Sequence, residues 1–118
     1  VDDSHPLGWG LAPDAVTLFA RSQVLERTDA GRAPGVSTPV CYAEADYLVS
    51  GWTLGGDEYL AGRTAVAQAA VDEGDVVLLA FDPIFRGQPR NTFKLFFNAL
   101  MGSATGELPT AAVGLECR

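Results

Sequence analysis

The clearest pattern along the chain is a pair of apolar runs, residues 64–71 and 76–81, separated by the polar residues 72–75. Two such runs around a short loop of Asp, Glu and Gly predict a β-hairpin with a four-residue loop. The first run has alanine at alternate positions, which would let another element approach its backbone closely. The second run, Val-Val-Leu-Leu-Ala-Phe, does not alternate with polar residues, which is typical of a strand buried on both faces.

A helix is predicted over residues 92–101, with Asn91 as its N-cap and Gly102 at its end. Its apolar residues surround the helix instead of forming one stripe, because only Lys94 and Asn98 are strongly polar. Such a helix is expected to be covered on most sides. Burial of its phenylalanines and leucines would contribute on the order of 10 kcal/mol before conformational entropy is subtracted. We therefore expect this buried C-terminal helix to anchor the core.

Other short strands are predicted from β-branched and aromatic residues. They cover residues 15–20, 40–43 and 47–50, and residues 24–25 form a second strand or the edge of one. Residues 51–62 contain four glycines and predict a loop with one helical turn. With the helix lying over the sheet, these elements favour a strand-rich α/β fold of two or three layers. We expect one domain over residues 1–102 and a flexible tail over residues 103–118.

The charge balance narrows the classes of partner. Fifteen acidic and eight basic residues give a net charge of −7 over 118 residues. We therefore expect no nucleic-acid binding, because the chain has no basic run that could neutralise phosphates. We also expect no binding to anionic membranes, because the surface is acidic. No apolar run approaches the ~20 residues of a membrane span, and the N-terminus lacks the features of a signal peptide. The chain begins without Met, so we expect that it was cut from something longer.

Few residues are suited to catalysis or to metal binding. One histidine and two cysteines offer too few ligands for a typical enzyme metal site, so we predict no catalytic and no metal residues. His5 is interpreted as a surface or turn histidine. Cys41 is expected to be a small buried residue; a Cys41–Cys117 disulfide and a nucleophilic role are the alternatives. The acids of residues 72–75 indicate a solvated tip rather than a calcium site.

The polar cluster of interest is Arg86, Gln88, Arg90 and Asn91, which lies between the second hairpin strand and the predicted helix. Ligand sites in α/β proteins tend to form where strands lead into helix N-termini. Two arginines at such a place could hold a carboxylate or a neighbouring domain. The alternative is that Arg86 and Gln88 hold their own loop through hydrogen bonds to backbone carbonyls.

Most of the chain also resembles a known family. The likeness covers residues 5–10, 47–52, 60–66 and 74–100, and its most specific parts are Phe-Arg-Gly-Gln-Pro at 85–89, Phe-Lys-Leu at 93–95 and Asn-Ala-Leu at 98–100. These segments resemble the C-terminal portion of bacterial zinc carboxypeptidase-like proteins of the carboxypeptidase A type. In those proteins a domain similar to class I glutamine amidotransferases, with a flavodoxin-like fold, follows the peptidase domain. The chain is similar to only the later part of such a domain.

The resemblance implies a parent protein that removes C-terminal residues from peptides with one zinc ion. That ion would be held by a His-x-x-Glu pair and a later His, with a separate Glu as general base. None of these residues has a counterpart here, so zinc is expected in the parent's peptidase domain and no cofactor in this chain. Cys41 and His5 likewise do not match the Cys–His–Glu set of active amidotransferases.

The resemblance therefore implies a non-catalytic accessory domain. Its expected partner is the parent's peptidase domain, and a peptide is a further candidate. The alternatives are a small-ligand module for sugars or peptides, which would use Trp9, Trp52 and Tyr59 as stacking faces, and an autonomous cysteine hydrolase. Localisation stays open, with secretion alongside the parent as one possibility.

Overall fold

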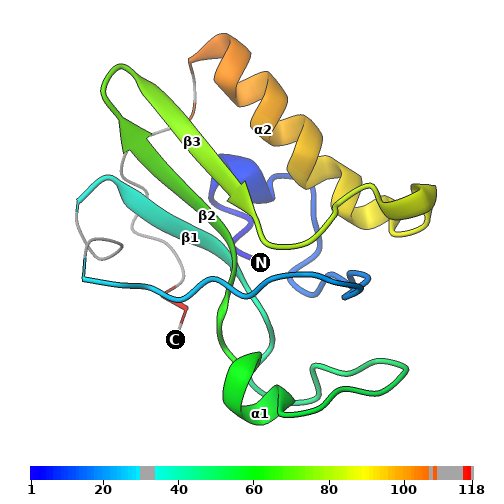
Figure 1. Ribbon diagram of the computed structural model, residues 1–118. Coiled ribbons are helices and arrows are strands. Elements are labelled where there is room, and N and C mark those ends of the chain that lie inside the picture. Colours follow the sequence, from blue (N-terminus) through cyan, green and yellow to red (C-terminus); the bar gives the residue numbers. More distant parts are fainter. Residues whose placement is uncertain (30–33, 107, 109–115, 118) are drawn as a thin grey trace.

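A single antiparallel sheet organises the described part of the protein (Figure 1). The computed structural model describes residues 1–29, 34–106, 108, 116 and 117. The strands follow the order β1-β2-β3, with β1 at Val36–Cys41, β2 at Thr64–Val71 and β3 at Gly74–Leu79. One long helix, α2 (Phe93–Thr105), lies over this sheet, so the fold is a two-layer mixed α/β arrangement.

The predicted hairpin is confirmed as β2 and β3, although its loop is shorter than expected. Val71 pairs with Gly74, which leaves only Asp72 and Glu73 in the turn instead of four residues. Asp72 has a φ of 52°, a left-handed conformation that Asp tolerates better than most residues. The loop prediction was wrong because composition marks turn-forming residues but does not determine where the ladder closes.

The remaining strand predictions were only partly right. Only Val40 and Cys41 of the segment predicted at 40–43 belong to β1, which begins at Val36 and contains Pro39. Residues 15–20 and 47–50 form no strand, although their side chains favour one, because a strand also needs a neighbour to pair with. Leu25 forms a single bridge with Thr64. The helical turn expected within 51–62 is present as α1 (Gly56–Tyr59).

The ends of α2 differ from the prediction. Asn91 is not its N-cap: a 3₁₀ turn, η4 (Arg90–Thr92), leads into the helix, and Asn91 Nδ2 instead donates to the Val16 carbonyl at 3.2 Å. Gly102 does not end α2, because the helix continues to Gly106, which closes it with a φ of 70°. Gly102 packs so closely against the Leu108 side chain that a Cβ at position 102 would clash with it. The boundary expected at residue 102 therefore falls inside α2.

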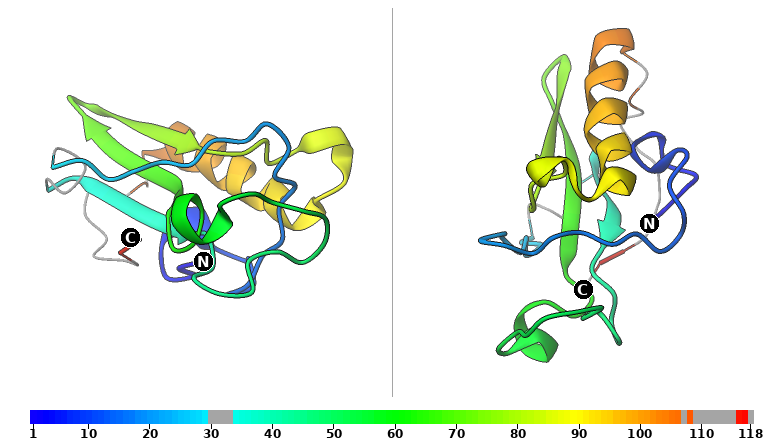
Figure 2. Two further views of the ribbon diagram at one scale, coloured as in Figure 1. Left: turned by 60° about the horizontal axis from the view of Figure 1, so that its bottom comes forward. Right: turned by 90° about the vertical axis from the view of Figure 1, so that its right-hand side faces the viewer.

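The N-terminal segment packs on the same side of the sheet as α2 (Figure 2). It contains a 3₁₀ turn, η1 (Pro6–Gly8). The two polar residues of the helix bind this segment: Asn98 Nδ2 donates to the carbonyls of Leu7 and Trp9 at 3.0 Å each, and Lys94 Nζ donates to the Gly10 carbonyl at 2.6 Å. The polar side of α2 is thus directed at another part of the protein.

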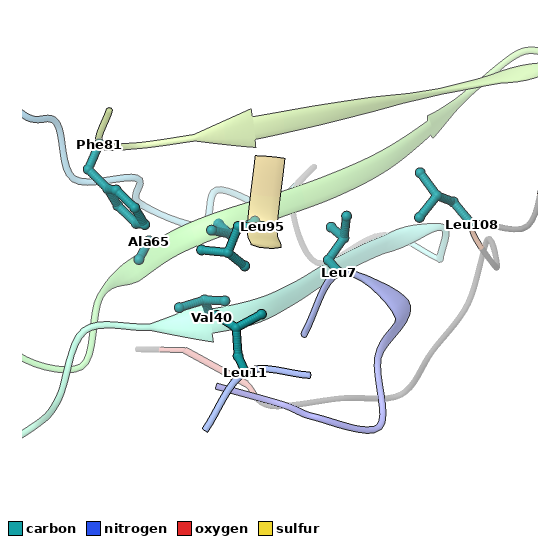
Figure 3. Packing of buried hydrophobic residues seen from close by; sticks show 8 residues of the cluster. Leu7, Leu11, Val40, Ala65, Phe81, Leu95 and Leu108 are labelled. Atoms are coloured by element: carbon teal, nitrogen blue, oxygen red, sulfur yellow. The ribbon is translucent and has the colours of Figure 1, made fainter. Parts of the chain in front are cut away.

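The hydrophobic core lies between the sheet and the layer that α2 and η1 form (Figure 3). Its buried members are Leu7, Leu11, Val40, Ala65, Val66, Phe81, Leu95 and Leu108. Leu95 is the buried apolar residue that α2 contributes, and Ala99 packs against the cluster from the side. The expectation of a helix covered on most sides is therefore wrong: the sheet and η1 cover one side of it.

The alternative of a Cys41–Cys117 disulfide is the one observed, with the sulfur atoms 2.11 Å apart. The bond joins the end of β1 to a residue 76 positions later. Cys117 and Leu108 are buried, and Ser103 and Thr105 are helical, so described parts of the predicted tail are held to the body. The rest of that tail lies outside the described residues. No helix in the described ranges is long and apolar enough to cross a membrane.

Candidate interaction site

The predicted polar cluster lies on the segment that links β3 to α2. This segment forms two 3₁₀ turns, η3 (Phe85–Gly87) and η4. Hydrogen bonds to its backbone shape it: Asp82 Oδ1 accepts from the Ile84 amide at 3.0 Å, and Thr92 Oγ1 lies 2.6 Å from the Pro83 carbonyl. The side chains of Asp82 and Thr92, not those of Arg86 and Gln88, therefore hold the loop.

Arg86 has an unusual backbone conformation. Its φ is 50°, a value uncommon for a residue with a Cβ, and Gly87 follows at 68°. The guanidinium lies 5.2 Å from the centre of the Phe85 ring, within the range of a cation–π contact. Arg86 and Arg90 are exposed, and neither forms an ion pair with a described residue. Both cations are therefore available to an anionic group outside the described residues.

Gln88 and Asn91 line a shallow groove of about 330 Å³. The opposite wall is formed by residues 16–18, and the Asn91–Val16 hydrogen bond ties the two walls together. The Gln88 side chain makes no hydrogen bond to the described residues. The Thr17 hydroxyl is buried in the wall without a described partner. The structure thus brings two of the four predicted residues into one groove, while Arg86 stacks on Phe85 beside it.

A second feature, missed at the sequence level, is the outward side of α2. Phe96, Phe97, Leu100 and Met101 are 37%, 53%, 55% and 62% exposed, and we call them the outer face of α2. The Phe96 and Phe97 rings contact each other edge to face, with centres 5.5 Å apart. The signal was present in the sequence as a helix apolar all round. Such a pattern predicts burial within this chain, which the described elements do not provide.

β3 likewise has apolar side chains that the described elements leave partly exposed. Val77 and Leu79 pack against the core, whereas Val76 and Leu78 on the opposite side are 44% and 48% exposed. The expectation of a strand buried on both faces is therefore wrong, because the helix covers only one face. The half-buried Ala67 and Ala69 of β2 lie on the same open side, as strand alternation requires.

His5 lies at a turn, as the N-cap of η1, but it is fully buried, so the interpretation as a surface residue is wrong. Its Nδ1 accepts a hydrogen bond from the Leu7 amide at 3.2 Å, so the ring proton is on Nε2, which lies 3.0 Å from Ser37 Oγ. Nε2 therefore donates to the serine and cannot accept its proton. Burial lowers the pKa of His5 below its ordinary value, and the charge of Asp2 partly opposes that shift. The pair is a structural contact that caps η1.

The other candidate chemistries find little support in the geometry. Within the described residues no group of three or more His, Cys, Asp or Glu side chains could hold a metal ion. Cys41 is in a disulfide, so the hypothesis of a cysteine hydrolase loses its nucleophile. Trp9 follows η1, Tyr59 is the last residue of α1, and Trp52 precedes α1 in the chain. No ring contact joins these three side chains.

No protein-family model, no curated protein and no solved structure matches this chain.

Proposed function

We propose that this chain is a non-catalytic accessory domain of a zinc carboxypeptidase-like protein. In that protein it would pack on the peptidase domain that removes C-terminal residues from peptides. The observation that carries the proposal is the outer face of α2. The resemblance of residues 85–89 and 93–100 to the C-terminal portion of those proteins names the partner.

The outer face of α2 supports a protein partner because of its size and composition. Four large apolar side chains sit on adjacent turns of one helix, and burial of each would contribute about 1.5 to 3 kcal/mol. Phe and Met are enriched where protein interfaces are fully buried, while polar and charged groups form the rim. Here Arg86, Gln88 and Arg90 precede the helix and supply such polar groups. The face therefore suits a folded domain better than a small molecule.

The finer fold assignment is part of the same proposal. We propose that the sheet and α2 are the later part of a flavodoxin-like domain similar to class I glutamine amidotransferases. The open side of β3 supports it, because Val76 and Leu78 require cover from a further layer or domain. The disulfide supports secretion of the parent, because disulfides persist mainly in oxidising compartments.

The proposal is tested by measuring whether this chain associates with the parent's peptidase domain, each produced separately. Replacement of both Phe97 and Met101 by Gln should weaken the association by at least about tenfold, since about 1.4 kcal/mol corresponds to a factor of ten. Leu54→Gln is the matched control, because Leu54 is 82% exposed and lies beside α1. No association, or equal losses in the control and the double variant, would refute the packing role.

The small-ligand alternative has one supporting observation, the groove between residues 16–18 and 88–91. A sugar or peptide there would meet the side-chain amide of Gln88, which has no described partner, whereas the Thr17 hydroxyl is buried in the wall. A thermal-shift screen with sugars and peptides tests this alternative. A ligand whose stabilising effect disappears in Gln88→Ala would favour it over the packing role.

A further inference from the structure

The two edges of the sheet are protected to different degrees. β1 contains Pro39, which has no backbone donor and whose carbonyl accepts a hydrogen bond from the Asp2 amide at 2.8 Å. The Cys117 sulfur lies 3.7 Å and 3.6 Å from the carbonyl oxygens of Thr38 and Val40. Proline and covering segments are the usual means by which proteins prevent an edge strand from pairing. The β1 edge is therefore protected.

Among the described residues, none covers the edge of β3 in this way. The Ala80 amide donates to the Ala65 carbonyl at 2.9 Å, so in this antiparallel register Val76 and Leu78 direct their backbone groups toward β2. Beyond the end of β3, the Ala80 carbonyl accepts from the Gln23 amide at 2.7 Å. The backbone groups of Val77 and Leu79 consequently point away from the sheet. No described residue supplies a backbone hydrogen bond to either of them.

The side chains of β3 also lack the features that discourage pairing. Gly74–Leu79 contains no proline, lysine or arginine, and its register with β2 is regular. The one charged residue in it, Asp75, accepts a hydrogen bond from Gln68 Nε2 at 2.9 Å. The half-exposed Val76 and Leu78 lie next to this edge. A regular, apolar edge of this kind is a template for another strand.

We propose that the free edge of β3 is a docking site for an extended polypeptide segment, which adds as a fourth strand and carries Lys or Arg beside the hairpin turn. The charge follows from the turn, where Asp72 and Glu73 are exposed and form no ion pair with a described residue. The apolar character follows from Val76 and Leu78. The edge is separate from the outer face of α2, so this inference goes beyond the proposed function.

A second copy of this chain fits the edge poorly. In an antiparallel pairing of β3 with itself, the acidic turn of one copy (Asp72 and Glu73) would approach the far end of β3 in the other copy, which Asp82 follows. Acidic groups brought together in this way repel each other. The net charge of −7 on each chain adds repulsion. A basic, extended segment avoids both penalties.

The test uses the whole chain and a synthetic peptide that alternates valine with threonine and has lysine at both ends. Binding should slow the hydrogen exchange of the Val77 and Leu79 amides by at least about tenfold, since both would acquire hydrogen-bond partners. Two control peptides sharpen the result. One has N-methyl groups on alternate amides and cannot pair, and the other has glutamate instead of lysine and would meet the acidic turn; both should bind at least about tenfold more weakly.

Two variants separate edge pairing from other modes of binding. Val77→Pro removes the outward N–H while leaving the bonds from Val76 and Leu78 to β2, and Leu78→Lys adds a charge beside the edge without changing the backbone. Each should abolish the exchange protection, and Leu78→Lys keeps the test valid if Val77→Pro does not fold. No binding, equal binding of the N-methylated peptide, or protection that persists in Leu78→Lys would overturn the proposal. A dimer of the unmodified chain that Leu78→Lys dissociates would also overturn it, in favour of a second copy as the occupant.

Discussion

Asn98 Nδ2 in α2 lies 3.0 Å from the carbonyl oxygen of Leu7, 91 positions earlier in the chain. This contact directs one of the two strongly polar residues of the helix toward the body of the protein. Lys94 is directed in the same way, toward Gly10. The apolar residues of the outer face are thereby left on the side where surface helices usually carry polar residues. In an isolated domain, the polar side chains of a helix would be expected to face solvent. In α2 the two strongly polar side chains contact the rest of the chain, and large apolar side chains face solvent instead.

Replacement of Asn98 by Ala should destabilise the chain by about 1 to 3 kcal/mol, because two backbone carbonyls lose their hydrogen-bond donor. Urea unfolding of the variant and the unmodified chain measures the difference. Ser103→Ala is a suitable control, since Ser103 is exposed in the same helix. An equal, small change in both variants would show that the helix does not depend on its contact with the N-terminal segment.

Leu95→Ala should reduce the free energy of unfolding by about 2 to 5 kcal/mol, because it leaves a cavity between α2 and the sheet. Phe97→Ala in the isolated chain should change it by much less, since Phe97 is 53% exposed. The comparison is made by thermal unfolding under one set of conditions. Comparable losses in the two variants would mean that the outer face of α2 is buried within this chain.

The sequence predicted the hairpin and the helix correctly, because both depend on local periodicity and turn residues. It did not predict the exposure of Phe97 and Val76, since an apolar pattern shows that a side chain requires cover but not which polypeptide supplies it. The sequence also did not reveal the pairing of β1 with β2. Pro39 disfavours a strand locally, and the hydrogen bonds that compensate for it come from residues distant in the chain. The same applies to Asn91, whose contact with Val16 spans 75 positions.

The candidate site was predictable to a similar extent. Spacing alone located Arg86, Gln88, Arg90 and Asn91 on one linking segment, and the structure places them there. The groove against residues 16–18 required the tertiary fold.

Stability should decrease as the pH falls below the ordinary pKa of His5, 6.5. Burial lowers the pKa of His5 in the folded state, so between the folded and unfolded pKa values the unfolded chain binds more protons. The stabilising contribution is therefore complete above pH 6.5 and is lost as the pH falls toward the folded pKa. Thermal unfolding of the chain and of His5→Gln across this range isolates the effect. A pH dependence that is unchanged in His5→Gln would assign the loss of stability to other groups.

Reduction of the Cys41–Cys117 disulfide should lower the free energy of unfolding by about 4.5 kcal/mol, the chain-entropy value for a closed loop of this length. Urea unfolding with and without a reducing agent measures it. Cys117→Ser should reproduce the reduced state and be insensitive to the reducing agent. If reduction leaves the unfolding transition unchanged, the bond does not constrain the fold.

Met101 is the residue at which the proposed role of the outer face of α2, as an interface in the parent protein, can be measured. It is the one methionine of the chain, and its side chain is 62% exposed. Oxidation by dilute peroxide, followed by mass spectrometry, reports its accessibility in the chain alone and in the full-length parent. We expect rapid oxidation in the chain alone and a rate lower by at least about tenfold in the parent, where the peptidase domain would cover the face. Equal oxidation rates in the two proteins would contradict it.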